Sequence, residues 1–182
     1  DIAYKEGMNH KGLVIITTSL TPKLSLETNA RDGKIITQAL HMTDPEEAAK
    51  FVITKKLTGF IFITTPEKFV LVEAAREDDG AGTYHATSRV VPKTEVVVRT
   101  NHGIFQKGAG YTHGKKRKSS VTRMELAKDH LVDVKKDMDV IDAMKKKYKK
   151  DPFLNPYRTK NMYHMQTTGQ IMMNLDKKLV VI

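Results

Sequence analysis

Two apolar segments in the middle of the chain constrain the fold most strongly. Phe60–Thr65 and Lys68–Glu73 are rich in phenylalanine, isoleucine and valine, residues that are enriched in strands. Only Pro66 and Glu67 separate these segments, so the sequence predicts an antiparallel hairpin. The continuous apolar run Leu13–Thr18 predicts a further strand that is buried on both faces.

Other segments add strands and loops around this hairpin. Further strands are predicted at Tyr84–Val91 and Glu95–Thr100, where β-branched residues gather. A closing hairpin is predicted from Gln166–Asn174 and Lys178–Ile182. Polar or glycine-rich segments at 21–33 and 107–118 predict exposed loops.

Helices are expected in three places. The first begins at Asp44-Pro45, since aspartate can cap a helix, proline fits its first turn and the two glutamates that follow complement its dipole. The others are predicted near 119–134 and 136–148, where apolar residues recur at helical spacing. Strands and helices together indicate an α+β fold in one domain over residues 1–182.

Composition narrows the function classes. The chain has no cysteine, which excludes disulfides, thiolate metal sites and a cysteine nucleophile within it and favours an intracellular, cytoplasmic protein. No apolar run approaches the ~20 residues that span a membrane, and the start does not resemble a signal peptide. The net charge of +10 suits an anionic partner or aids solubility.

Asn101 is the first candidate site residue. It lies in Thr100-Asn101-His102-Gly103, directly after the predicted strand, and Asn-x-Gly is a turn signal because both residues tolerate left-handed backbone geometry. A carboxamide fixed at a strand end can donate a hydrogen bond to developing negative charge. The alternative is that Asn101 only shapes the turn.

Arg123 is the most informative single charge. In a helix it shares one face with Leu126, Ala127, His130, Leu131 and Val134. A buried charge costs several kcal/mol unless it is paired. Arg123 therefore either points into a pocket or extends along the helix surface to reach water.

Other polar residues carry weaker signals. Asn9 lies between Gly7 and Gly12 in a turn that feeds the first strand, where a structural role is the simpler interpretation. The seven histidines show no metal-ligand spacing. The cluster Lys115–Lys118 either contacts phosphate or is solvated. No phosphate-binding glycine loop is present, so no cofactor or metal is expected.

Three motifs in this order resemble those of the N-terminal-nucleophile (Ntn) hydrolases. Gly7–Leu13 resembles their GMNEKGL turn, Thr100–Gly103 their TNH strand end, and Ser119–Arg123 their SSxxR helix start. Thr167–Asp176 is similar to their late TxxSxxMD strand, with a looser match at Gly169-Gln170. The similar group covers choloylglycine hydrolases, penicillin V acylases and acyl-CoA:isopenicillin N acyltransferase-like proteins.

The resemblance implies a fold and a mechanism. The fold is an αββα four-layer sandwich, and an N-terminal Cys, Ser or Thr attacks a linear amide with its own α-amino group as base. The backbone N–H of Asn9 and the side chain of Asn101 would form the oxyanion hole. Arg123 would hold negative charge beside the nucleophile, and His102 would contact the acyl-amide substrate.

Departures from the family pattern leave alternatives open. Asp1 is not a nucleophile, and the family's nucleophile lies upstream of the Gly-Met-Asn turn. We therefore expect that an upstream segment or a separate subunit carries it, with the N-terminal strands absent here, or that the chain is a catalytically inactive homologue. A basic module that binds nucleic acid or another polyanion is the alternative from a different class. A homo-oligomer stays open.

Overall fold

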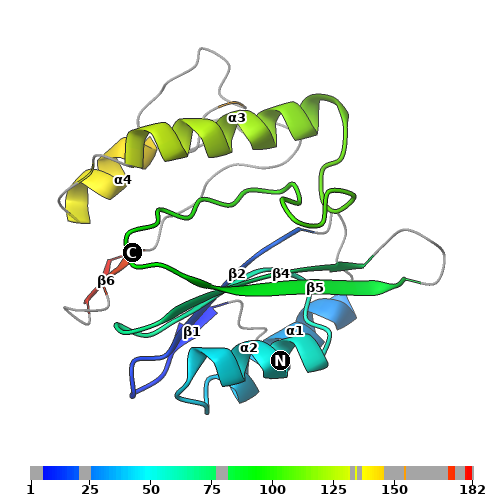
Figure 1. Cartoon of the computed structure of the whole chain (residues 1–182), viewed down its shortest axis with the longest axis vertical. Coiled ribbons are helices and arrows are strands. Elements are labelled where there is room, and N and C mark those ends of the chain that lie inside the picture. Colours follow the sequence, from blue (N-terminus) through cyan, green and yellow to red (C-terminus); the bar gives the residue numbers. More distant parts are fainter. Residues whose placement is uncertain are drawn as a thin grey trace. The chain divides into compact units, whose positions relative to one another are not determined.

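The computed structural model describes residues 6–20, 26–76, 82–131, 134, 137–145, 154, 172–174 and 179–181 (Figure 1). The chain divides into two compact units. Unit 1 comprises residues 1–95 and 101–112, and unit 2 comprises residues 96–100 and 113–182. Strands and helices occur in both units, which confirms the α+β class. No helix within the described ranges is long and apolar enough to cross a membrane.

Unit 1 is built on a five-stranded antiparallel sheet in the order β1-β2-β3-β4-β5. Its strands are β1 (Glu6–Met8), β2 (Val14–Thr18), β3 (Gly59–Thr64), β4 (Phe69–Arg76) and β5 (Tyr84–Val91). The predicted hairpin is confirmed as β3–β4, with Ile61 opposite Val72. The predicted strands β2 and β5 are confirmed as well.

Two helices cover one face of this sheet, as Figure 1 shows for α1 (Leu26–Ala39) and α2 (Pro45–Thr54). The predicted start of α2 is confirmed, since the Asp44 carboxylate accepts a hydrogen bond of 3.0 Å from Glu46 N. The loop predicted at 21–33 is wrong from Leu26 onward. Burial of Ile35 and Ile36 against the sheet outweighs the polar residues that favour a loop.

The core of unit 1 lies on both faces of the sheet. The cluster beneath the helices joins side chains of β2, β3 and β4 to those of α1 and α2. On the opposite face, Leu20, Phe60 and Ala75 form a smaller cluster with Ala109 and Ile104. The segment 101–112 covers the face of the sheet that the helices leave open. Both faces of β3 and β4 are therefore buried, which explains why their sequences are continuously apolar.

The strand predicted at Glu95–Thr100 is wrong. After β5 the chain turns, and Glu95 N donates to Pro92 O at 3.0 Å. Residues 96–100 belong to unit 2 and form no strand. There the Thr100 hydroxyl donates to Ser120 O at 2.8 Å and accepts from the Ser120 hydroxyl at 2.9 Å. Thr100 therefore contacts α3 (Gly114–Leu131) through hydrogen bonds, and no strand pairing is described for residues 96–100.

The described part of unit 2 contains two helices and a strand pair. They are α3 (Gly114–Leu131), α4 (Asp137–Lys145), β6 (Met172–Asn174) and β7 (Leu179–Val181). The antiparallel β6–β7 pair, with Met173 opposite Val180, confirms the predicted closing strands where they are described. The loop predicted at 107–118 is wrong from Gly114 onward, because α3 begins there. The lysines at 146–150 and most of Thr167–Asp176 lie outside the described residues.

The half-buried tyrosine of β5, Tyr84, makes stability depend on pH. The Tyr84 hydroxyl donates to Leu57 O at 3.0 Å, and burial raises the pKa of Tyr84 from 10.0 to about 12, against the opposing charge of Arg76. The folded state thus favours the neutral phenol. This contribution to stability is fully present below pH 10 and is lost as pH rises towards about 12.

Tyr84→Phe removes the ionisable group. The unfolding free energy of wild type should therefore fall relative to that of the variant as pH rises through this window. Urea unfolding of both proteins at several pH values between about 9 and 12 measures it. Lysine deprotonation occurs in both proteins and cancels in the comparison. A difference in unfolding free energy that stays constant across the window would contradict the prediction.

Candidate functional site

Residues 101–111, here called the site loop, lie in unit 1 on the face of the sheet opposite α1 and α2. The loop begins with Asn101. The Asn101 carboxamide donates to Ser19 O at 3.1 Å, and Ser19 directly follows β2. The predicted location of Asn101 at the end of a strand over residues 95–100 is wrong, since no strand forms there; its carboxamide instead contacts the residue that follows β2. A hydrogen bond to a fixed carbonyl orients the carboxamide.

Backbone hydrogen bonds close the site loop on itself. Tyr111 N donates to Asn101 O at 2.7 Å, Gly103 N donates to Ala109 O at 3.1 Å, and Ala109 N donates to Gln106 O at 2.8 Å. His102 and Gly110 form an antiparallel bridge between the first two of these bonds. The loop is thus a compact unit, in which the first residue is fixed by the last.

Two glycines allow this closure. A Cβ on Gly103 would collide with the carbonyl oxygen of Gln106, and a Cβ on Gly110 would collide with that of Asn101. Gly110 also has a φ of 71°, whereas Asn101 and Gly103 keep negative φ values. The turn geometry expected for Asn-x-Gly is therefore wrong, because Gly103 is required by lack of space and not by a left-handed backbone.

A buried carboxylate holds the centre of the loop. Glu73 on β4 is only 1% exposed, and its Oε1 accepts hydrogen bonds from Ile104 N (2.7 Å), Phe105 N (3.0 Å) and Gln106 N (2.9 Å). Successive N–H groups that converge in this way form a nest for an anion. Glu73 Oε2 is buried without a hydrogen-bond partner among the described residues.

Sequence reasoning missed Glu73 by treating it as the last residue of a strand. The structure extends β4 to Arg76, which places Glu73 inside a strand whose residues from Val70 to Ala75 are all buried. A single acid within a buried apolar run must find several donors, because an unpaired buried charge is costly. That signal was present in the sequence, but the donors lie more than thirty positions away.

Asn9 is fully engaged in the β1–β2 turn. Its Nδ2 donates to Leu40 O and Met42 O at 2.8 Å each, and its Oδ1 accepts from Lys11 N and Leu13 N at 2.9 Å each. Its backbone N–H donates to Leu13 O at 2.9 Å. The structural interpretation of Asn9 accounts for these contacts, and the N–H expected in an oxyanion hole is used inside the turn.

The structure does not bring Asn9 and Asn101 together. Asn9 is bonded to Leu13, just before β2, whereas Asn101 is bonded to Ser19, just after it. Strand residues advance by about 3.3 Å each, so these anchor points lie roughly 20 Å apart. A single small oxyanion cannot contact both residues in this conformation.

His102 is buried in the site loop, with only 3% of its surface exposed. A side chain so enclosed does not present its imidazole to an incoming molecule. The burial gives no support to the predicted contact between His102 and a substrate.

Arg123 belongs to unit 2, on α3. Its Nε donates to the Ser119 hydroxyl at 3.4 Å, and the side chain is partly buried. The predicted apolar stripe is wrong, since Ala127 is buried but His130 is exposed and α3 ends at Leu131 before reaching Val134. Ser119 and Ser120 are instead the other buried positions described on α3.

The basic cluster Lys115–Lys118 occupies the first turn of α3, which contains no acidic residue. The N-terminal end of a helix carries partial positive charge, so cations there are destabilising. Three of these four side chains are exposed and Arg117 is partly so. Lysines near the C-terminal end of a helix, such as those expected at the end of α4, would instead be stabilised by the helix dipole.

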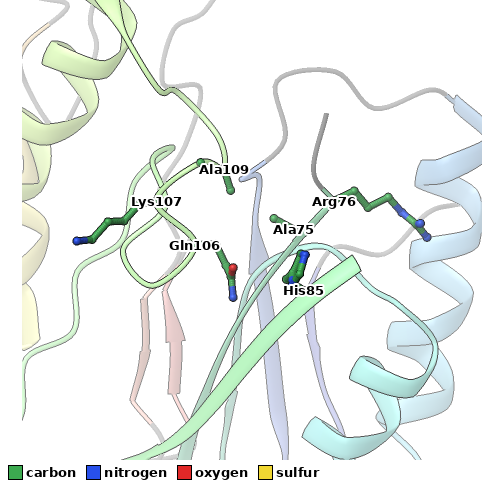
Figure 2. A pocket seen from close by; sticks show the side chains of 7 residues that line it. Ala75, Arg76, His85, Gln106, Lys107 and Ala109 are labelled. Carbon is green, nitrogen blue, oxygen red and sulfur yellow. The ribbon is translucent and has the colours of Figure 1, made fainter. Parts of the chain in front are cut away.

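A small pocket of about 130 Å³ adjoins the site loop. It is lined by Ala75, Arg76, His85, Gln106, Lys107, Gly108 and Ala109. Figure 2 shows the Arg76 and Lys107 side chains extending away from Gln106 and His85 in opposite directions. The two cations do not converge on the pocket. We assign the pocket no cofactor.

Within the part of the chain that the structure describes, no three His, Cys, Asp or Glu side chains gather where they could hold a metal ion. No protein-family model, curated protein or solved structure matches the chain. Function is therefore inferred from residues and geometry. The strongest arrangement is a carboxamide fixed beside a sheet by a loop that a buried carboxylate holds in place.

Gly103→Ala and Gly110→Ala should each lower the free energy of unfolding by about 1–3 kcal/mol, since each forces a methyl group into filled space. Gly108→Ala is the matched control in the same loop, because its Cβ would have no atom within 4 Å. It should stay within about 0.5 kcal/mol of wild type. Denaturant unfolding of the three variants checks this, and equal effects at all three positions would contradict it.

Proposed function

We propose that this chain is part of an Ntn-type amidohydrolase or acyltransferase that acts on linear amide bonds of a small-molecule substrate. The observation that supports it best is the Asn101 carboxamide, oriented by Ser19 O at 3.1 Å and set at the start of a closed loop. Donors fixed before the reaction stabilise developing charge without reorganisation. The motif resemblance supplies the reaction class.

The proposed reaction proceeds through an acyl-enzyme. A Cys, Ser or Thr upstream of Asp1, exposed by autoprocessing or carried on a separate peptide, gives its side-chain proton to its own α-amino group. Its sulfur or oxygen bonds to the amide carbon, and the carbonyl oxygen becomes the oxyanion. The C–N bond then breaks, and the amine leaves with that proton. Water, or another acyl acceptor, attacks the resulting ester or thioester and frees the nucleophile.

The proposed fold is the αββα sandwich in one domain over residues 1–182. The helices α1 and α2 on a five-stranded antiparallel sheet support one helical layer and one sheet of that architecture. The proposal adds a second sheet, to which β6 and β7 belong, and a second helical layer with α3 and α4.

Roles differ among the candidate residues. Asn101 is proposed as the side-chain donor of the oxyanion hole. Asn9 and His102 keep their catalytic and substrate-binding roles only as predictions from the resemblance, since the described contacts explain both as parts of the fold. Arg123 carries five N–H donors, and its predicted role is to hold negative charge beside the nucleophile.

Asn101→Ala in the complete protein should lower kcat for amide turnover by roughly 10²–10³-fold, the usual effect of removing one oxyanion donor. Gln38→Ala, which removes an exposed carboxamide on α1, is the control and should leave kcat unchanged. Steady-state kinetics with a panel of acyl amides measures both. Unchanged turnover in Asn101→Ala would remove the assigned role.

An electrophilic acyl probe separates the enzyme from an inactive homologue. Stoichiometric labelling of the complete protein at an N-terminal Cys, Ser or Thr is expected. Absence of labelling, with the fold intact by circular dichroism, would favour a scaffold without catalysis.

Binding of nucleic acid is a second candidate, favoured by the basic cluster Lys115–Lys118. Four consecutive cations at the positive end of a helix weaken that helix, each by about 0.3–1 kcal/mol. A polyanion that contacts them would reverse this cost. Stability sacrificed at a surface position is typical of binding sites.

Lys115→Glu should therefore raise the melting temperature while weakening DNA or RNA binding and lowering the salt slope of affinity by about 1. Lys34→Glu is the matched control, since it makes the same charge change on the exposed surface of α1. It should leave the slope unchanged. Titrations at two or more salt concentrations measure this, and an absence of binding at low salt would exclude the candidate.

A further inference from the structure

Glu73 does more than pack in the apolar interior of unit 1, because its carboxylate also binds the backbone of the site loop. Its neighbours along β4 from Val70 to Ala75 are apolar and buried, so an apolar residue would suit this position if it served only the core. Burying a carboxylate is costly unless several hydrogen bonds compensate for lost water. The chain meets that condition with three backbone N–H groups on Oε1, at 2.7–3.0 Å.

The three donors, residues 104–106, directly follow Gly103 in the chain. Gly103 N and Ala109 O bond across the loop at 3.1 Å, and Tyr111 N bonds to Asn101 O at 2.7 Å. A displacement of residues 104–106 must therefore pass to Gly103 and Ala109, and from them to the backbone of Asn101. Glu73 acts on Asn101 through this short hydrogen-bonded path.

We propose that Glu73 is a positioning residue for the reaction, which fixes the site loop so that the Asn101 carboxamide is aligned before the oxyanion forms. This rests on the proposed function. The nest formed by Ile104, Phe105 and Gln106 is an anion site that the protein fills with its own side chain. A carboxylate supplied from solution should therefore replace that side chain.

Glu73→Ala removes a methylene and a carboxylate, and acetate has nearly the same atoms. In the complete protein, Glu73→Ala should lower kcat about 10–100-fold with little change in KM, because the oxyanion contact is made mainly in the transition state. Millimolar acetate should restore kcat in a saturable manner, whereas chloride should not. Acetate should leave wild type unchanged.

Two controls isolate the effect. Glu67→Ala removes an exposed carboxylate from the β3–β4 turn and should show neither the loss nor the rescue. Adding Glu73→Ala to Asn101→Ala should cause little further loss of kcat, since both changes remove the same interaction. Rates are expressed per probe-labelled site, so a smaller folded fraction lowers the labelled amount and leaves kcat unchanged.

Glu73→Gln keeps the side-chain shape, and it tests the positioning role of Glu73 if Glu73→Ala does not fold. Its neutral oxygen accepts weaker hydrogen bonds than a carboxylate, so kcat per labelled site should fall several-fold. Unchanged kcat per labelled site in Glu73→Gln, or in folded Glu73→Ala without acetate, would overturn the positioning role.

Failure of the proposed function gives a different result. Wild type would then remain unlabelled by the acyl probe, and the catalytic role of Glu73 would fall with it. Amide hydrogen exchange at Ile104, Phe105 and Gln106 tests the contact separately. Faster exchange in Glu73→Ala, slowed again by acetate, is expected, and wild-type protection in Glu73→Ala would overturn the contact even in an active enzyme.

Discussion

A loop can cover a sheet only if its buried backbone groups find partners. The backbone of β4 cannot supply them, because its hydrogen bonds pair with β3 and β5 on either side. The side chain of Glu73 supplies the missing acceptor, and one oxygen atom satisfies three consecutive N–H groups. The second cluster of the core depends on this, since Ile104 and Ala109 reach Phe60 and Ala75 only when the site loop lies flat on the sheet.

The same loop links stability and the proposed chemistry. Its closure needs Gly103 and Gly110 at points where no side chain fits, and its first residue offers the carboxamide that we assign to the oxyanion. A catalytic donor in such a place needs no rearrangement during the reaction. A charged group that is almost completely enclosed holds this loop against the sheet.

Local sequence signals predicted much of the fold. The β3–β4 hairpin, β5 and the Asp44 cap were predictable, because period, turn and cap lie within a few residues of one another. Contacts distant in the sequence decided the rest. The start of α1 depends on burial of Ile35 and Ile36 against the sheet, and the valines before Thr100 form no strand because no neighbouring strand pairs with them. Asn101 was a candidate from its turn motif, although the turn geometry and the strand expected there are wrong. Glu73 was missed because its partners are 31–33 residues away.

Asn9 has a consequence for how the molecule opens. Its side chain joins the β1–β2 turn to the carbonyls of Leu40 and Met42, at the junction between α1 and α2. A three-residue edge strand such as β1 would ordinarily fray without affecting the rest of a domain. Here the turn that ends β1 cannot leave the helix junction without breaking two hydrogen bonds, so the turn and the junction are linked. The β1–β2 turn is thereby tied to the helical layer as well as to the sheet.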